Sequence, residues 1–377
     1  MKLTSEFTPL LDHEVFAVDS TSAQIVTRGT DSRDGTARIR VGGQIMTAEL
    51  TAGVAVINVD QLEPDSAFEI EILDASDRAV TALTGRTRPA IEPTAKVATI
   101  SDVHLGAEGF GPFVEGTDTG EVPYALRCGA AAIAEAVAWG AQALIIKGDL
   151  TETGEQENWA LAETMLAHVP IPMLFAAGNH DVWGSSDTLP EDGAHRIGVP
   201  YQDVQTLDLP GARVVLVDTA RPGKGTGELA AFADEILSAM DTDDPVLLAL
   251  HHQIQDTRLP RIWPPGISST NAAPVLKRLE ATPGTLLITS GHTHRNRIRR
   301  VGPTGSILHS EVSSTSDYPG VWAGYEFAGS LIRQTVRRIA SPDALSWTEP
   351  TRRAVGGIWG RWSQGQFRDR CVDVVSS

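Results

Sequence analysis

Short apolar runs alternate with helix-like segments along most of the chain after residue 95, and this alternation constrains the fold more than any other feature. The runs are four or five residues long, a length typical of buried strands. Predicted strands lie at 97–100, 143–146, 173–176, 214–217, 246–250 and 286–289, and predicted helices at 130–139, 156–168, 228–240 and 272–279. Strands that alternate with helices predict an α/β domain.

The first 88 residues have a different pattern. Segments 37–41, 54–59 and 67–72 alternate apolar and polar residues, and Gly, Asp, Pro and Ser separate them. Such alternation is typical of a small antiparallel sheet domain. Residues 89–95 carry two prolines and no amphipathic pattern, so we expect a linker there. The chain therefore predicts an all-β domain at 1–88, joined to the α/β domain.

Charge and composition exclude several classes of protein. The 31 basic and 48 acidic residues give a net charge of −17, which argues against nucleic-acid or anionic-membrane partners. We see no apolar stretch that resembles a secretory signal or a membrane span, so we expect a cytoplasmic protein without membrane contact. Cys128 and Cys371 are too few for a disulfide framework or a thiolate metal site.

Five predicted strands are followed directly by side chains that can bind metal ions. These side chains are Asp102 and His104, Asp149, Asn179 to Asp181, His251 and His252, and His292 and His294. Ligands bind beyond the carboxyl ends of strands in an open α/β sheet, so we expect the five loops to meet at one site. A single aspartate would more often cap a turn. Four isolated histidines are expected to be packing or surface residues, namely His13, His168, His195 and His309.

The ordered motifs Asp-x-His, Gly-Asp, Gly-Asn-His-Asp, His and Gly-His-x-His, over about residues 95–315, resemble the calcineurin-like metallophosphoesterase superfamily. The strings ISDVHLG, KGDLTETG, GNHD and GHTH are most similar to its bacterial cyclic-nucleotide-phosphodiesterase-like branch. The resemblance implies a four-layer αββα sandwich at 96–318, with residues 319–377 packed on it as an extension. In the first domain, LEPDSAFEIEI and TGRTRP loosely resemble fibronectin type III domains.

The resemblance also implies a role for each position. Asp102, His104, Asp149 and His294 would hold one metal ion, and Asp149, Asn179, His251 and His292 would hold the other, with Asp149 bridging. A metal-bridging hydroxide would attack phosphorus, and His180 would stabilise charge or protonate the leaving oxygen. Mixed imidazole and oxygen ligands suit Mn, Fe, Co or Zn better than Ca or Mg.

Details next to these motifs narrow the choice of activity. Purple acid phosphatases have a tyrosine ligand where this chain has Glu152. Calcineurin-type protein phosphatases have Asp-Arg-Gly after the aspartate that corresponds to Asp149, whereas this chain has Leu150-Thr151-Glu152, which argues against a phosphoprotein phosphatase. We expect a phosphodiesterase of small substrates. A phosphomonoesterase and a non-catalytic metal-binding scaffold remain alternatives.

Five further expectations concern the surroundings of the site. His251 rather than His252 should face the metal, and Asp181 should orient His180 or cap a turn. Gly178 should allow a sharp backbone turn. Loops 106–123 and 255–271, the second with Arg258, Arg261 and Trp263, could contact substrate. A tail that contains Trp322, Trp347, Trp359 and Trp362 could add strands and form a lid, a homodimer contact or an extra packing layer.

Overall fold

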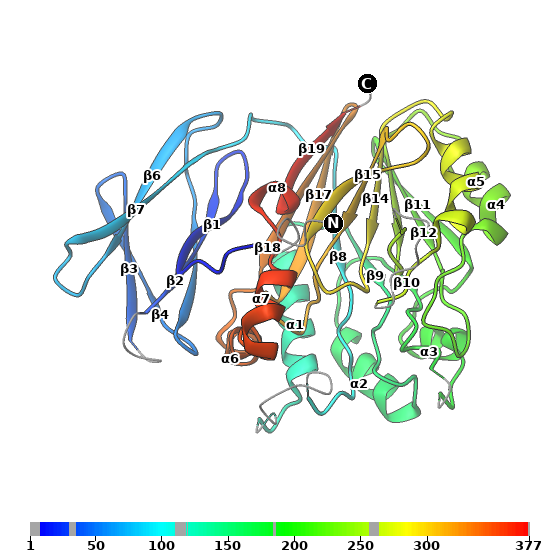
Figure 1. Cartoon of the computed structure of the whole chain (residues 1–377), viewed down its shortest axis with the longest axis horizontal. Coiled ribbons are helices and arrows are strands. Elements are labelled where there is room, and N and C mark those ends of the chain that lie inside the picture. The colour runs from blue at the N-terminus through cyan, green and yellow to red at the C-terminus, as the bar shows by residue number, and fades with distance from the viewer. Residues whose placement is uncertain are drawn as a thin grey trace.

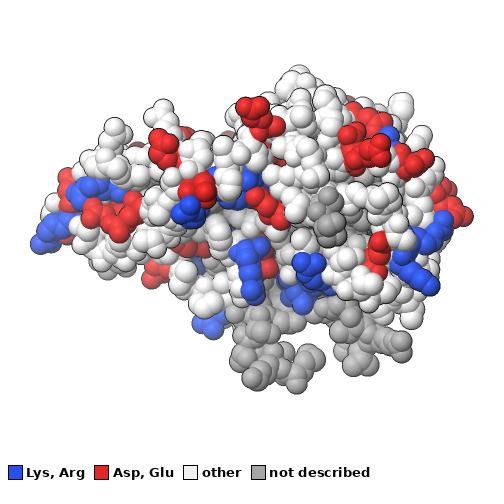
Figure 2. Space-filling model, turned by 90° about the horizontal axis from the view of Figure 1, so that it is seen from above, with Lys and Arg blue, Asp and Glu red and all other residues white. Residues whose placement is uncertain are grey.

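We analysed a computed structural model of the chain, which describes residues 8–29, 35–109, 118, 120–183, 186–255 and 264–375. Figure 1 shows a small all-β domain beside a larger α/β domain. Within the described residues, no helix is long and apolar enough to cross a membrane. Acidic and basic side chains are interspersed on the face of the molecule drawn in Figure 2.

The N-terminal domain is a sandwich of two antiparallel sheets. The first sheet has the order β1-β2-β5 and the second has the order β4-β3-β6-β7. The strands are β1 (His13–Val18), β2 (Ala23–Arg28), β3 (Thr36–Val41), β4 (Gln44–Glu49), β5 (Val54–Val59), β6 (Ala67–Leu73) and β7 (Ala79–Arg86). Ile25, Ile39, Ile57 and Ile70 meet in the core between the sheets. The predicted all-β domain is confirmed, and its fibronectin type III-like character stays a prediction.

Two six-stranded sheets form the centre of the α/β domain. The first has the order β10-β9-β8-β17-β18-β19 and the second has the order β11-β12-β13-β14-β16-β15. The first comprises β8 (Ala95–Ile100), β9 (Ala143–Lys147), β10 (Met173–Ala176), β17 (Val321–Ala328), β18 (Leu331–Arg338) and β19 (Cys371–Val375). The second comprises β11 (Val204–Leu209), β12 (Ala212–Val217), β13 (Val246–Leu250), β14 (Leu286–Ser290), β15 (Arg297–Val301) and β16 (Ile307–Glu311).

Helices cover the outer face of each sheet. They are α1 (Tyr124–Ala138), α2 (Gln156–Leu166) and α3 (Pro190–Arg196) on the first sheet, and α4 (Ala233–Ala239) and α5 (Ser269–Leu279) on the second. Alternate residues of a strand point to opposite faces. Ile145 therefore packs between the sheets, whereas Leu144 and Ile146 pack under α1 and α2. This burial on both faces explains the apolar runs in the sequence, and it confirms the αββα architecture.

One predicted helix differs from the structure. Instead of one helix over 228–240, the chain forms a 3-10 turn η3 (Ala230–Phe232) followed by α4. The side-chain oxygen of Asn271 accepts hydrogen bonds from the backbone of Leu229 and Ala230, at 2.8 and 3.1 Å. This contact satisfies donors of the first turn and sets where the helical region begins.

The segment 319–377 is part of the first sheet as well as a covering layer. β17 pairs with β8 and β18, and α6 (Pro342–Thr351), η4 (Ala354–Gly357), α7 (Ile358–Ser363) and α8 (Phe367–Arg370) complete the segment. Figure 1 shows that it lies between the sandwich domain and the rest of the α/β domain. Phe16 and Val26 of the sandwich share one apolar cluster with Leu345 and Val374. The two domains therefore have a continuous core.

Candidate metal centre

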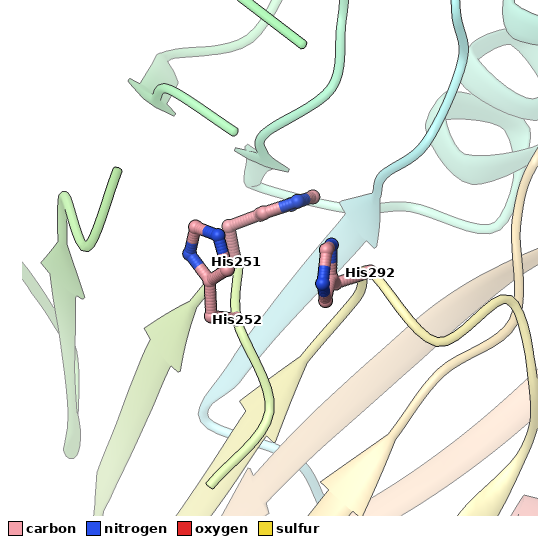
Figure 3. A group of neighbouring side chains, drawn as sticks. All are labelled: His251, His252 and His292. Atoms are coloured by element: carbon pink, nitrogen blue, oxygen red, sulfur yellow. The ribbon is translucent and has the colours of Figure 1, made fainter. Parts of the chain in front are cut away.

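The predicted site residues lie on loops at the carboxyl ends of five strands. β8 leads to Asp102 and His104, β9 to Asp149, β10 to Asn179 and His180, β13 to His251 and His252, and β14 to His292 and His294. β8, β9 and β10 are parallel, as are β13 and β14, so their ends share an edge of each sheet. Figure 3 shows His251 and His252 after β13 facing His292 after β14. The loops converge as the sequence predicts. We call this group of side chains the metal centre.

The backbone of these loops is unusual. Of the ten non-glycine residues with positive φ in the described part of the chain, five are Asp102, His104, Asp149, His292 and His294. Such conformations cost free energy and occur mostly where function requires them. The sharp turn expected at Gly178 stays a prediction, but a Cβ atom there would lie 2.1 Å from Asp149 Oδ1. This glycine allows a close approach of two loops.

In the first half of the metal centre, two imidazole nitrogens face each other. His104 Nε2 lies 3.3 Å from His294 Nε2, and His294 Nε2 lies 3.4 Å from Asp102 Oδ1. The opposite nitrogens are engaged by carboxylates, with Glu152 Oε2 2.7 Å from His104 Nδ1 and Asp317 Oδ2 2.5 Å from His294 Nδ1. A carboxylate only accepts, so each Nδ1 carries a proton. In the neutral rings both Nε2 atoms then present lone pairs, which fits a cation between them.

The second half has the same character. His251 Nε2 lies 3.2 Å from Asp149 Oδ2 and 3.3 Å from Asn179 Oδ1, while its Nδ1 donates to the Lys147 carbonyl at 2.8 Å. His292 Nε2 donates to the Pro265 carbonyl at 2.8 Å, which leaves Nδ1 with a lone pair. Asp149 Oδ2 also lies 3.9 Å from His104 Nε2. Asp149 therefore stands between both halves.

Buried carboxylates and imidazoles shift each other's pKa in this centre. Burial alone would raise the pKa of Asp149, but His251 and the other histidines hold it well below its ordinary value. Burial alone would lower the pKa of His251, but Asp149 raises it to about 9. Burial together with His251 lowers the pKa of His292 to about 4. Positive charge is thus required beside the carboxylates, and a metal ion would supply it while displacing protons from the imidazoles. The His and Asp clusters indicate divalent metal ions.

Comparison with known proteins decides the family. The model of the calcineurin-like phosphoesterase family matches residues 95–296. The chain belongs to this family. A probable cyclic nucleotide phosphodiesterase of Rhodococcus erythropolis is 33% identical over 164 residues, which are 41% of this chain and 50% of that protein. A cAMP/cGMP dual specificity phosphodiesterase of Mycobacterium tuberculosis is 30% identical over 119 residues, which are 29% of this chain and 36% of that protein. The matched part of the chain thus spans about half the length of the first relative and a smaller share of the second.

Solved structures of low sequence identity also match this calcineurin-like phosphoesterase. A purple acid phosphatase from yellow lupin seeds has a TM-score of 0.47 at 11% identity, and the match covers 90% of this chain and 76% of the lupin chain.

His180 lies at the solvent side of the metal centre. Its side chain is 28% exposed. Its backbone N–H donates to Asp149 Oδ1 at 2.8 Å, and its Nδ1 donates to the Glu152 carbonyl at 2.9 Å. The ring is held through Nδ1, so Nε2 is the nitrogen available to a bound molecule.

The expectation that Asp181 orients His180 is wrong. Asp181 is fully buried and accepts hydrogen bonds from Thr151 N at 2.8 Å, Thr151 Oγ1 at 2.7 Å and Gly178 N at 2.8 Å. The carboxylate thereby joins the loops after β9 and β10. Its role is the capping of backbone amides, the other option that the sequence left open.

His252 is buried beside His251 rather than turned away from the site. Its Nδ1 lies 2.9 Å from Thr219 Oγ1, and its ring centroid lies 4.7 Å from that of His292. Its Nε2 has no hydrogen-bond partner among the described residues. His251, His252 and His292 form one of the clusters that could hold a metal ion. His251 is the one that approaches Asp149 and Asn179.

Sequence reasoning missed Glu152 and Asp317 as partners of histidines. Glu152 stood out only because it replaces a tyrosine, and Asp317 had no motif. The isolated His309 is fully buried, with Nε2 2.9 Å from Ser290 Oγ, as a packing histidine would be. Residues 110–117, 119 and 256–263 of the two substrate-loop candidates, including Arg258, Arg261 and Trp263, lie outside the described residues.

Proposed function

We propose that the chain hydrolyses phosphodiester bonds of small substrates with two divalent metal ions. Their ligands would be Asp102, His104, Asp149, Asn179, His251, His292 and His294. The observation that carries this proposal is the convergence of imidazole nitrogens, because the Nε2 atoms of His104 and His294 lie 3.3 Å apart while each Nδ1 is bound to a carboxylate. Only a proton or a cation between them makes this contact favourable.

When bound there, two such ions supply charge neutralisation at phosphorus and a water of lowered pKa as the nucleophile. The protein side chains do the remaining work. Glu152 and Asp317 fix the orientation of His104 and His294, and Asp149 joins both halves. His180, held at Nδ1 by the Glu152 carbonyl, points Nε2 at the substrate and protonates the leaving oxygen when the ring is fully protonated.

Diester substrates are favoured over monoesters. Both relatives with at least 30% identity are named as cyclic nucleotide phosphodiesterases, and a cyclic nucleotide is a phosphodiester. The mixture of imidazole, amide and carboxylate donors favours Mn, Fe, Co or Zn as the metal. A phosphomonoesterase would use the same centre and is the second candidate.

Metal reconstitution tests the proposal. Protein stripped with a chelator and reloaded with Mn, Fe, Co or Zn should bind about two ions per chain and hydrolyse bis-(p-nitrophenyl) phosphate faster than p-nitrophenyl phosphate. Elemental analysis and a p-nitrophenolate assay measure both quantities. A protein that binds the ions but hydrolyses neither ester would support the alternative of a non-catalytic metal-binding scaffold. Faster hydrolysis of the monoester would support a phosphomonoesterase.

A further inference from the structure

A tryptophan lies against the proposed catalytic histidine. Trp183 is the second residue after the Gly-Asn-His-Asp motif. Its ring stacks on that of His180 with centroids 5.2 Å apart and an interplanar angle of 22°. It is 48% exposed, so much of the indole is accessible to a bound molecule. The exposed indole thus lies beside the histidine that we propose as the proton donor to the leaving oxygen.

Trp183 is one end of a row of aromatic rings. His180 packs edge-on against His104 at 4.6 Å, His104 lies 5.2 Å from His294, and Trp359 lies 5.9 Å from His294. The two tryptophans differ in their surroundings. Trp359 is 8% exposed and its Nε1 donates to Asp317 at 3.4 Å, so it supports a histidine from inside the protein. Trp183 instead offers its ring to solvent beside His180.

We propose that Trp183 is a specificity-determining residue that selects phosphoesters with a planar group, such as a nucleobase or an aryl ring, on the side of the leaving oxygen. This inference rests on the proposed function, because His180 marks the leaving oxygen only if the centre hydrolyses phosphoesters. A planar group beyond that oxygen would continue the stack of His180 and Trp183. Stacking of one base on an aromatic side chain changes affinity by about 5- to 100-fold.

Substitutions at Trp183 separate stacking from support of His180. The ratio of kcat/KM for a purine cyclic nucleotide to kcat/KM for an alkyl diester such as glycerophosphoethanolamine should fall about 5- to 100-fold in Trp183→Ala and in Trp183→Leu. Trp183→Phe keeps a planar ring and should retain most of the ratio. Phe367→Ala is the control, because Phe367 is an aromatic side chain of similar exposure, 44%, on α8. An equal loss on both substrates would overturn the proposal and assign Trp183 to the support of His180.

Binding keeps the proposal testable without hydrolysis. Calorimetry on metal-loaded protein should give tighter binding of adenosine 5′-monophosphate than of ribose 5-phosphate, and Trp183→Ala should abolish the difference. A wild-type protein that binds both compounds equally would refute the stacking role, whatever its activity. A base preference that depends on Trp183, in a protein without phosphoesterase activity, would refute the proposed function alone.

Discussion

Two buried polar regions of this protein use similar side chains in opposite ways. The first, which we call the interdomain layer, lies between the sandwich domain and the C-terminal segment. Its members are Glu14, Arg28, Arg338, Glu349 and Arg370. Glu349 accepts from Arg28 at 2.7 and 3.1 Å and from Arg338 at 2.7 Å. Glu14 accepts from Arg370 at 3.0 Å. Each carboxylate has its own guanidinium partner from a distant part of the chain.

The second region, the metal centre, brings acceptors together instead. Imidazole nitrogens of His104, His251 and His294 face one another and carboxylate and amide oxygens. Five residues of these loops have positive φ. In the interdomain layer, Arg28 and Arg338 belong to the regular strands β2 and β18. The contrast teaches that buried charge is structural where the chain supplies its own counter-charge. Where carboxylates and imidazoles converge on a strained backbone, we expect a bound cation to replace the protons that the imidazoles would otherwise hold.

The largest effect should come from Asp149→Asn, since this side chain stands between both halves of the metal centre. We expect the metal content to fall by about one ion or more per chain, and the hydrolysis of bis-(p-nitrophenyl) phosphate to fall on the order of 10³-fold, because an ion contributes several kcal/mol to the barrier. Elemental analysis and steady-state kinetics measure these changes. Two retained ions at full rate would mean that Asp149 is no more than another buried charge.

His180→Ala should separate leaving-group chemistry from metal binding. If His180 protonates the leaving oxygen, kcat should fall about 10²- to 10⁴-fold for an alkyl ester. The loss should be much smaller for a p-nitrophenyl ester, whose leaving group needs no proton. The metal content should be unchanged. Equal losses on both esters would instead assign His180 to phosphate positioning, and loss of metal would place it among the ligands.

In the interdomain layer, Glu349→Gln should destabilise the fold rather than reduce the metal content. The change leaves Arg28 and Arg338 without a charged partner, and breaking a buried ion pair from one side costs about 3–5 kcal/mol. Denaturant unfolding of metal-loaded protein measures the cost. Arg278→Ala is the control, because its ion pair with Asp234 is 50% and 91% exposed and should be worth less than about 1 kcal/mol. A loss of bound metal in folded Glu349→Gln would contradict the separation of the two regions.

The interdomain layer also predicts acid sensitivity. Burial alone would raise the pKa of Glu349, but Arg338 and Arg28 lower it to about 2, below its ordinary value of 4.5. Between these values the unfolded chain binds more protons, so stability falls as the pH drops from 4.5 to about 2. The loss at this residue should be about 3 kcal/mol. The measurement should use metal-stripped protein, so that release of metal at low pH does not add to the loss of stability at Glu349. In that protein, Glu349→Gln should flatten this part of the stability curve, and an unchanged slope would locate the acid sensitivity elsewhere.

The sequence predicted the site residues that directly follow strands, and it missed the side-chain contacts and strand pairing between distant parts of the chain. Ligand candidates such as Asp102 and His292 were found because strands buried on both faces appear as apolar runs and parallel strands end at one edge. Two roles stayed open for Asp181 because its neighbour in sequence is His180, whereas its side chain accepts a hydrogen bond from Thr151. β17 pairs with β8 although the two strands are more than 200 residues apart in the sequence. Such non-local pairing has no local signal.

Asp317 lies where the metal centre and the interdomain layer meet, so a substitution there shows to which region it belongs. It lies 2.5 Å from His294 Nδ1, and the next residue, Tyr318, receives a hydrogen bond from Arg28 of the interdomain layer at 3.3 Å. Asp317→Asn keeps an oxygen that can accept from Nδ1 but removes the charge that makes the ring a better donor to a cation. We expect metal affinity to fall about 10- to 100-fold, the usual effect of losing such a partner, with little change in the unfolding free energy.

Competition with a chelator measures that affinity, and Trp359→Phe is the matched control. This substitution removes the hydrogen bond of 3.4 Å from the indole to the other oxygen of Asp317 and keeps an aromatic ring at this position. It should weaken metal binding less than Asp317→Asn does, because the carboxylate keeps its charge and its contact with His294. If Asp317→Asn instead lowers the unfolding free energy and leaves metal affinity intact, Asp317 belongs to the interdomain layer. The boundary between the two regions would then run between Asp317 and His294.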